Sequence, residues 1–123
     1  MFKQKVIEVV NNIPHGKVVS YGQVAAYIAL PRAARQVGWV LRGMAGNNVP
    51  WWRVVNKKGV ISINGNFHAD RNLQKKLLEA EDILVNDFQV DMGKYRFIAS
   101  TKLLKKLQLS DNYIQEAISK FSI

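Results

Sequence analysis

Two adjacent tryptophans, Trp51 and Trp52, constrain the fold of this chain more than any other feature of the sequence. Pro50 before them fixes its own φ angle and pushes the residue that precedes it towards an extended conformation. The β-branched pair Val54 and Val55 that follows predicts the start of a strand. The tryptophans therefore lie at a stiff corner between a loop and a strand. Large flat side chains at such a corner suit either a core anchor or the wall of a pocket for a flat ligand.

The charge of the chain indicates a polyanionic partner. The 18 Lys and Arg residues outnumber the 9 Asp and Glu residues, and the resulting net charge of +9 favours nucleic acid first and an anionic membrane surface second. The sequence holds no cysteine, which excludes disulfides, thiol nucleophiles and Cys-ligated zinc. It has two histidines and no apolar run near the roughly 20 residues of a membrane span. We expect a cytoplasmic protein without metal, cofactor or membrane segment.

A predicted helix that begins at Tyr21 offers a site that suits a phosphate group. Ser20 has the character of an N-cap, and Gln23 three residues later completes a capping-box pattern, so the helix should run to about residue 28. Backbone N–H groups without partners at a helix N-terminus attract anions, phosphate included. Tyr21 is therefore either a residue on the phosphate side of a DNA interface or a half-buried aromatic, and the pattern favours neither interpretation.

A second predicted helix, from about Arg32 to Arg42, has one apolar and one basic face. Pro31 is expected in its first turn and Gly43 just after its end. At about 100° per residue, the basic face combines three arginines with a tryptophan: Arg32, Arg35, Trp39 and Arg42. Two helices joined by a short turn, the second basic on its outer side, indicate a DNA-binding helix-turn-helix. A merely solvated charged face is the alternative.

The rest of the chain completes an α+β fold. Two β-branched runs around residues 57–59 predict a β-hairpin, which after a helix-turn-helix indicates a winged helix. Further elements are expected as a helix over 2–12, a helix after Asp70 that buries Leu73, Leu77, Leu78 and Ala80, and short strands at 83–85 and 95–97. Residues 1–97 should thus form a winged-helix-like helix-turn-helix DNA-binding domain with a small β-hairpin. Residues 98–123 should form a helical C-terminal extension, either packed on the domain or acting as a partner-binding or dimerising arm.

Over about residues 2–97, these motifs together resemble the DNA-binding domain of the O6-alkylguanine-DNA alkyltransferases. The matching runs are Ile13-Pro14-His15-Gly16-Lys17-Val18, Ser20-Tyr21-Gly22-Gln23-Val24-Ala25, Ala33-Ala34-Arg35-Gln36-Val37-Gly38, Pro50 with Arg53-Val54-Val55, Gly59, and Lys76-Leu77-Leu78 with Glu81. The alkyltransferases carry Pro-Cys-His-Arg where this chain reads Pro50-Trp51-Trp52-Arg53. Tryptophan has neither a thiol nor a basic nitrogen, so alkyl transfer to this position is chemically unavailable.

A tryptophan at the cysteine position resembles the alkyltransferase-like proteins. The resemblance implies a non-enzymatic sensor that binds O6-alkylguanine in double-stranded DNA by nucleotide flipping and passes the site to nucleotide excision repair proteins. It also implies that Tyr21 presses on the phosphate of the target nucleotide, that Arg35 enters the base stack through the minor groove, and that Arg53 and Glu81 brace the pocket. The expected DNA contacts are Tyr21, Arg32, Arg35, Gln36, Trp39 and Arg42, and the expected pocket residues are Trp51, Trp52, Val54, Ser62, Asn64 and Gly65.

Three positions depart from or blur the family pattern. Trp39 stands where relatives have a smaller or polar residue, and Asn64 stands where they often have a basic or tyrosine side chain. Either Asn47 or Asn48 matches the family's hinge asparagine.

Two other functions stay open: a winged-helix regulator that reads DNA sequence, and an enzyme such as a glycosylase. The enzyme needs a placed acid or base, and the acidic residues Asp70, Glu79 and Glu81 lie outside the pocket motif. Location is expected to be cytoplasmic and nucleoid-associated, or nuclear in a eukaryote.

Overall fold

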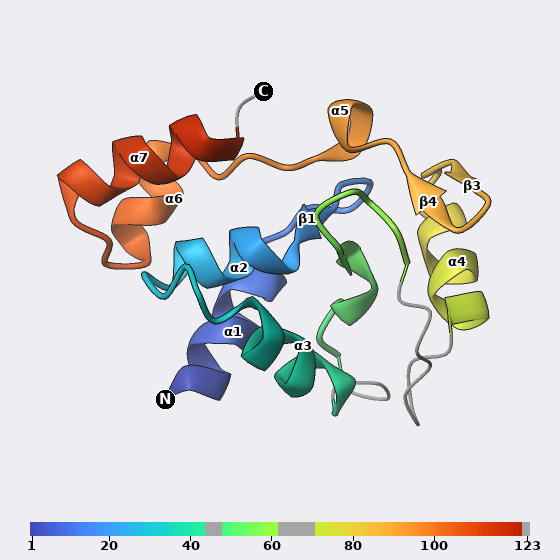
Figure 1. Cartoon of the computed structure of the whole chain (residues 1–123), viewed down its shortest axis with the longest axis horizontal. Helices are drawn as coiled ribbons and strands as arrows, with labels where there is room; N and C mark the ends of the chain where they lie inside the picture. Colours follow the sequence, from blue (N-terminus) through green and yellow to red (C-terminus); the bar gives the residue numbers. More distant parts are fainter. Residues whose placement is uncertain (44–47, 62–70, 122–123) are drawn as a thin grey trace.

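A computed structural model of the chain describes residues 1–43, 48–61 and 71–121. It has a mixed α+β architecture, as predicted, made of helices and two small two-stranded sheets, one of which lies at the edge of the molecule (Figure 1). In chain order the described elements are α1 (Phe2–Asn11), β1 (Val19–Ser20), α2 (Tyr21–Tyr27), α3 (Ala34–Arg42), the 3-10 turn η1 (Trp51–Arg53), β2 (Val54–Val55), α4 (Arg71–Glu79), β3 (Val85–Asn86), β4 (Gln89–Val90), α5 (Met92–Tyr95), α6 (Thr101–Lys106) and α7 (Asp111–Phe121).

Helix α2 begins at the predicted capping box. The Gln23 backbone N–H donates to Ser20 Oγ at 3.1 Å, and the Ser20 N–H donates to Gln23 Oε1 at 3.0 Å. Each side chain thereby satisfies a backbone donor that the first helical turn leaves unpaired. The start of α2, and with it the location of Tyr21, is therefore determined locally.

Helix α3 begins at Ala34, two residues later than the sequence predicts. Ala29 adopts a positive φ of 62°, and the Ala33 N–H donates to the carbonyl oxygen of Leu30 at 2.9 Å. This turn contains Pro31 and Arg32, so Pro31 precedes the helix instead of occupying its first turn. The end of α3 is as predicted, since Gly43 follows Arg42 as the C-cap.

The strand pairing corrects the predicted position of the hairpin. Strand β2 pairs in parallel with β1, with Val19 opposite Val54. The turn expected at 57–59 does form, because Asn56 Oδ1 accepts from the N–H groups of Lys58 and Val60, both at 2.9 Å. Val60 then forms a bridge with Gln89 on β4, and the small hairpin is β3–β4. Two-residue runs contain too little side-chain pattern to select their partner.

Helix α4 buries a polar side chain where an apolar one was expected. Leu73 is 42% exposed and Ala80 is exposed, which corrects the predicted apolar face, whereas Leu78 is fully buried. Gln74 is only 3% exposed, because its side-chain amide donates to the carbonyl oxygens of Trp52 and Val54, each at 3.0 Å. The helix is thereby tied to the backbone of the tryptophan corner.

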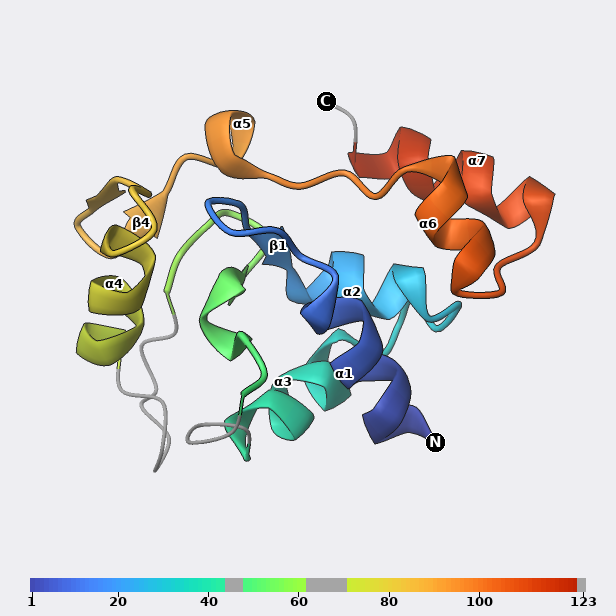
Figure 2. The same cartoon turned by 180° about the vertical axis from the view of Figure 1, so that it is seen from behind.

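The C-terminal helices α6 and α7 pack along α2, on the side away from α3 (Figures 1 and 2). Leu104 and Ile114 are buried in the same core cluster as the side chains of α1 and α2. The rings of Tyr27 and Phe121 meet edge to face with centroids 6.3 Å apart. The expected boundary between residues 1–97 and 98–123 stays a prediction. Within the described residues, no helix is long and apolar enough to cross a membrane.

Candidate nucleic-acid interface

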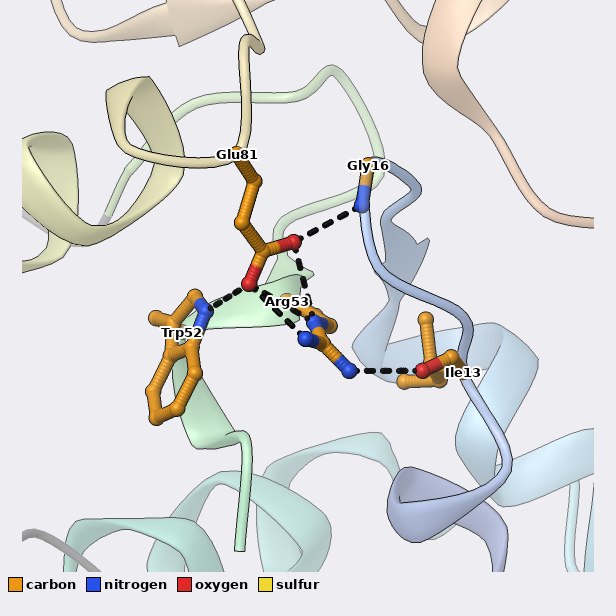
Figure 3. A network of polar contacts seen from close by, with 5 residues as sticks. All are labelled: Ile13, Gly16, Trp52, Arg53 and Glu81. Atoms are coloured by element: carbon orange, nitrogen blue, oxygen red, sulfur yellow. Dashed lines mark hydrogen bonds and ion pairs between the residues drawn. The ribbon is translucent and has the colours of Figure 1, made fainter.

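A largely buried ion pair between Arg53 and Glu81 links the tryptophan corner to two segments that are distant in the sequence (Figure 3). The guanidinium of Arg53 donates to Glu81 Oε2 from Nη2 at 2.9 Å and from Nε at 3.0 Å. Its Nη1 donates to the carbonyl oxygen of Ile13 at 2.8 Å. The same carboxylate accepts from the Gly16 N–H at 2.8 Å and from Trp52 Nε1 at 2.7 Å. Arg53 and Glu81 therefore hold the corner, the turn after α1 and the end of α4 together.

The hydrogen bonds on Glu81 keep its carboxyl group ionised. Burial acts to raise its pKa, but the donors on Arg53, Gly16 and Trp52 outweigh that effect, so the pKa lies below the usual glutamate value. Ion pairs that leave water are tolerable only when additional hydrogen bonds satisfy the remaining lone pairs. Both carboxylate oxygens have such donors here, which makes the pair a rigid support.

The two tryptophans of the corner have different surroundings. Trp51 is 6% exposed and belongs to the main core cluster, while Trp52 is half-buried. Their rings meet edge to face at 87°, with centroids 5.9 Å apart. The bond from Trp52 to Glu81 fixes the orientation of the second ring. In this structure the corner is thus a packed anchor whose outer surface is Trp52.

The outer face of α3 carries the predicted basic residues. Arg35, Trp39 and Arg42 are exposed, as is Gln36, and Arg32 is exposed in the turn before the helix. Val37 and Leu41 are buried on the opposite face, and Ala34, which the sequence places with them, is half-buried. Arg35 and Arg42 make no ion pair with any residue that the structure describes. Their charges are therefore available to an anionic partner.

Tyr21 joins this face from the N-terminus of α2. Its ring contacts α3, because a Cβ atom placed on Gly38 would lie 3.9 Å from Tyr21 Cε1. Burial raises the pKa of the Tyr21 phenol above its usual value, and the nearby positive charge of Arg42 lowers it in part. The phenol therefore stays protonated at neutral pH and can donate a hydrogen bond. The structure brings Tyr21, Arg42 and Arg35 to one side of the helix-turn-helix.

The predicted lesion pocket is only partly within the described residues. Ser62, Asn64 and Gly65 lie outside them, as do Asn47 and Asp70. Val54 is fully buried in the core below the corner. The roles of Ser62, Asn64, Gly65 and Val54 in a lesion pocket stay predictions.

Sequence reasoning missed two residues that hold the corner. Gln74 was not among the residues expected to be buried, and no periodicity rule would have found it. Gly16 carried a signal, since Pro14 and Gly16 together predict a turn in the sequence, and the structure gives Gly16 a φ of +84°. Only the folded structure shows that the Gly16 N–H points at Glu81.

Among the described residues, the site has binding groups but no pair suited to proton transfer. Position 51 holds no nucleophile, and the nitrogen of Trp52 is only a donor. Among the residues that the structure covers, no three His, Asp or Glu side chains gather to hold a metal ion. Glu79 is exposed at the end of α4. The arrangement suits the binding of an anion and a flat ring.

Comparison with known proteins agrees with this geometry. Residues 1–83 match the family model of the 6-O-methylguanine DNA methyltransferase DNA-binding domain. The chain is 44% identical over 98 residues to the DNA base-flipping protein of Escherichia coli K12, covering 78% of this chain and 74% of that protein. It is 38% identical over 96 residues to alkyltransferase-like protein 1 of Schizosaccharomyces pombe, covering 77% of this chain and 86% of that protein.

A solved structure supports the same relationship. The crystal structure of S. pombe Atl1 in complex with damaged DNA containing O6-carboxymethylguanine matches with a TM-score of 0.73 at 34% identity. The match covers 78% of this chain and 94% of the S. pombe chain. The sequence match, the matching fold and the tryptophan at the acceptor position all agree. The chain, which holds no cysteine, belongs to the family of the 6-O-methylguanine DNA methyltransferase DNA-binding domain, and within it to the group of the alkyltransferase-like and DNA base-flipping proteins.

Proposed function

We propose that this protein is a non-enzymatic sensor of O6-alkylguanine in double-stranded DNA. The observation that carries the proposal is the braced corner, which holds tryptophan at the acceptor position beside the unpaired basic face of α3. Two relatives support it by name, as a DNA base-flipping protein and an alkyltransferase-like protein. The matching S. pombe protein is itself bound to DNA that contains O6-carboxymethylguanine.

The basic face provides the contacts to DNA. Arg32, Gln36 and Arg42 lie on the outer side of the helix-turn-helix and reach phosphates or groove edges. Tyr21 acts at the phosphate of the target nucleotide, where its protonated phenol donates a hydrogen bond. Arg35 enters the base stack and fills the space that the flipped nucleotide leaves. Insertion of this kind from the minor groove bends the duplex.

The tryptophan corner receives the flipped base. Flipping costs a few kcal/mol of lost stacking and pairing, and the alkylated base offsets part of that cost by contact with an aromatic ring. Stacking on an aromatic side chain contributes about 1–3 kcal/mol per base. Trp51 and Trp52, with Val54, Ser62, Asn64 and Gly65, are the proposed lining. Arg53 and Glu81 brace it without touching DNA.

Binding without repair leaves the lesion for other proteins. A bent, protein-bound duplex is a suitable signal for nucleotide excision repair proteins, which we propose as partners. The site of action is the cytoplasm, at the nucleoid, or the nucleus if the source is eukaryotic.

The test is the affinity for two matched duplexes at fixed salt, one with a single O6-methylguanine and one with guanine. Tighter binding to the lesion by about tenfold or more, equivalent to about 1.4 kcal/mol, supports the sensor. Equal binding contradicts it and leaves a winged-helix regulator that reads sequence. Release of free base from the lesion duplex would instead reveal a glycosylase. Affinity should also fall as salt rises, because phosphate contacts release counterions.

A further inference from the structure

Trp39 differs from the other two tryptophans in its surroundings. It is 57% exposed, whereas Trp51 is 6% exposed and Trp52 is tied to Glu81. Within the part of the chain that the structure describes, Trp39 has no aromatic or cation–π partner. Isolated apolar residues on a surface are common. Trp39 differs from such residues because it lies among the basic side chains of α3.

Trp39 lies on the exposed outer side of α3, between two arginines that form no ion pair with any described residue. Arg35 precedes it by four residues and Arg42 follows it by three, so all three side chains are neighbours on one helix face. An indole with cations beside it offers a flat apolar surface in a positive field. A nucleic-acid base attached to its phosphate chain matches both properties. An apolar protein partner would match only the ring.

The helix geometry places Trp39 and Tyr21 on opposite sides of Arg35. At about 100° per residue, Trp39 is rotated about 40° from Arg35 in one direction and Gly38 about 60° in the other. The Tyr21 ring lies on the Gly38 side. If Tyr21 marks the strand of the flipped nucleotide, Trp39 therefore faces the undamaged strand.

The spacing along the helix separates the actions of Arg35 and Trp39. Four residues of helix advance about 6 Å. The two side chains therefore leave the helix about one turn apart. Trp39 therefore works beside Arg35 and does not compete with it for the vacated space.

We propose that Trp39 stacks on the unpaired base that remains in the undamaged strand opposite the flipped nucleotide. This inference rests on the proposed function, because it requires α3 to bind at a flipped site. The chain would then hold both members of the broken base pair: the alkylated base at the tryptophan corner and its former partner on Trp39. Aromatic residues that wedge into the stack from the minor groove also stabilise a bent duplex.

The test is a cycle of protein and DNA changes at fixed salt. The unmodified chain, Trp39→Leu and Trp39→Phe are titrated with an O6-methylguanine duplex that has either cytosine or an abasic site opposite the lesion. With cytosine present, we expect Trp39→Leu to bind about tenfold more weakly, while Trp39→Phe keeps most of the affinity. With the abasic site, the unmodified chain and Trp39→Leu should bind within about twofold of each other. Leu84→Ala, at a site 59% exposed on the segment between α4 and β3, is the matched control and should bind like the unmodified chain.

Two results of this titration would overturn the inference. Unchanged or tighter binding by Trp39→Leu would mean that the indole contributes nothing or obstructs the groove. An equal loss on both duplexes would place the contact elsewhere. Failure of the proposed function is recognised separately, because the unmodified chain would then bind the lesion and guanine duplexes equally. Equal urea midpoints for all variants verify that each is folded.

Fluorescence gives a second readout that a purely structural role would not change. Trp39 is the most exposed tryptophan, so its emission should be quenched when a base stacks on it. The quenching on addition of the lesion duplex should be smaller in Trp39→Phe, which keeps Trp51 and Trp52. Equal quenching in both proteins would contradict stacking at this position.

Discussion

The tryptophan corner and the outer face of α3 use the same types of residue in opposite ways. At the corner, the Arg53 guanidinium and the Trp52 indole direct N–H groups to one carboxylate, and both side chains are at least half-buried. On α3, Arg35 and Trp39 are exposed and have no ion-pair or ring partner among the described residues. One arrangement makes the fold rigid and the other leaves its side chains available to bind.

The comparison indicates that different residues provide stability and DNA binding: the corner stabilises the fold, and the outer face of α3 binds. A buried charge that loses its partner is costly, so the corner tolerates little change. An exposed arginine that loses its charge costs little stability but removes a contact to phosphate or base. Substitutions in the two regions should therefore change different measured quantities.

The largest expected effect is on stability, from Glu81→Gln. The change leaves the Arg53 guanidinium buried without a counter-charge, and breaking such a pair costs about 3–5 kcal/mol. The free energy of unfolding from urea titration is the measurement. Glu79→Gln, on an exposed side chain of α4, is the control and should stay within about 0.5 kcal/mol. A loss below about 1 kcal/mol for Glu81→Gln would remove the contrast between the two regions.

The next effect should appear in binding and not in stability. Arg35→Ala should weaken lesion binding by about 1–3 kcal/mol, more than Arg32→Ala or Arg42→Ala, because it removes the group proposed to enter the stack. Its free energy of unfolding should change by less than about 0.5 kcal/mol. Titration of the lesion duplex and urea unfolding of the same protein give both numbers. Equal losses for all three arginines would mean that α3 binds as a diffuse charged face.

A smaller effect is expected at acid pH. Because the pKa of Glu81 is lowered on folding, the ionised carboxylate stabilises the folded state above the unfolded value of about 4.3. As pH falls from there through the lower folded pKa, the unfolded state takes up its proton first, and this contribution is lost. Urea midpoints between pH 7 and pH 3 should therefore fall further in the unmodified chain than in Glu81→Gln. Parallel curves would contradict this assignment.

The last prediction is that a substitution at the acceptor position produces no alkyl-transfer activity. Trp51→Cys should not restore alkyl transfer, although it returns a thiol to the acceptor position. The neighbouring Trp52 has no basic nitrogen, and its N–H is already donated to Glu81 at 2.7 Å, so this side chain cannot take the proton of the thiol. Mass spectrometry of the variant after incubation with O6-methylguanine DNA is the check. A methylated cysteine would show that the corner holds a base we did not identify.

The parts of the fold that local rules decide were predictable. The capping box at Ser20, the stop at Gly43 and the basic outer face of α3 follow from residues close together in the chain, and the structure confirms them. The partner of Val54–Val55 was not predictable, because a two-residue strand contains no pattern that selects a neighbour. Leu73 was expected to be buried and is exposed, whereas Gln74 beside it is buried, because the backbone carbonyls that Gln74 satisfies come from a different segment.

The sequence by itself determined the class of fold, the family and the loss of alkyl-transfer chemistry. These depend on which residues are present and on their order, and no arrangement of a chain without cysteine can supply a thiol. Only the tertiary structure decided that Glu81 holds Gly16, Trp52 and Arg53 together, and that Trp39 stays exposed with no ring or cation–π partner among the described residues. Burial and hydrogen-bond geometry arise when distant segments meet, and sequence spacing does not specify them.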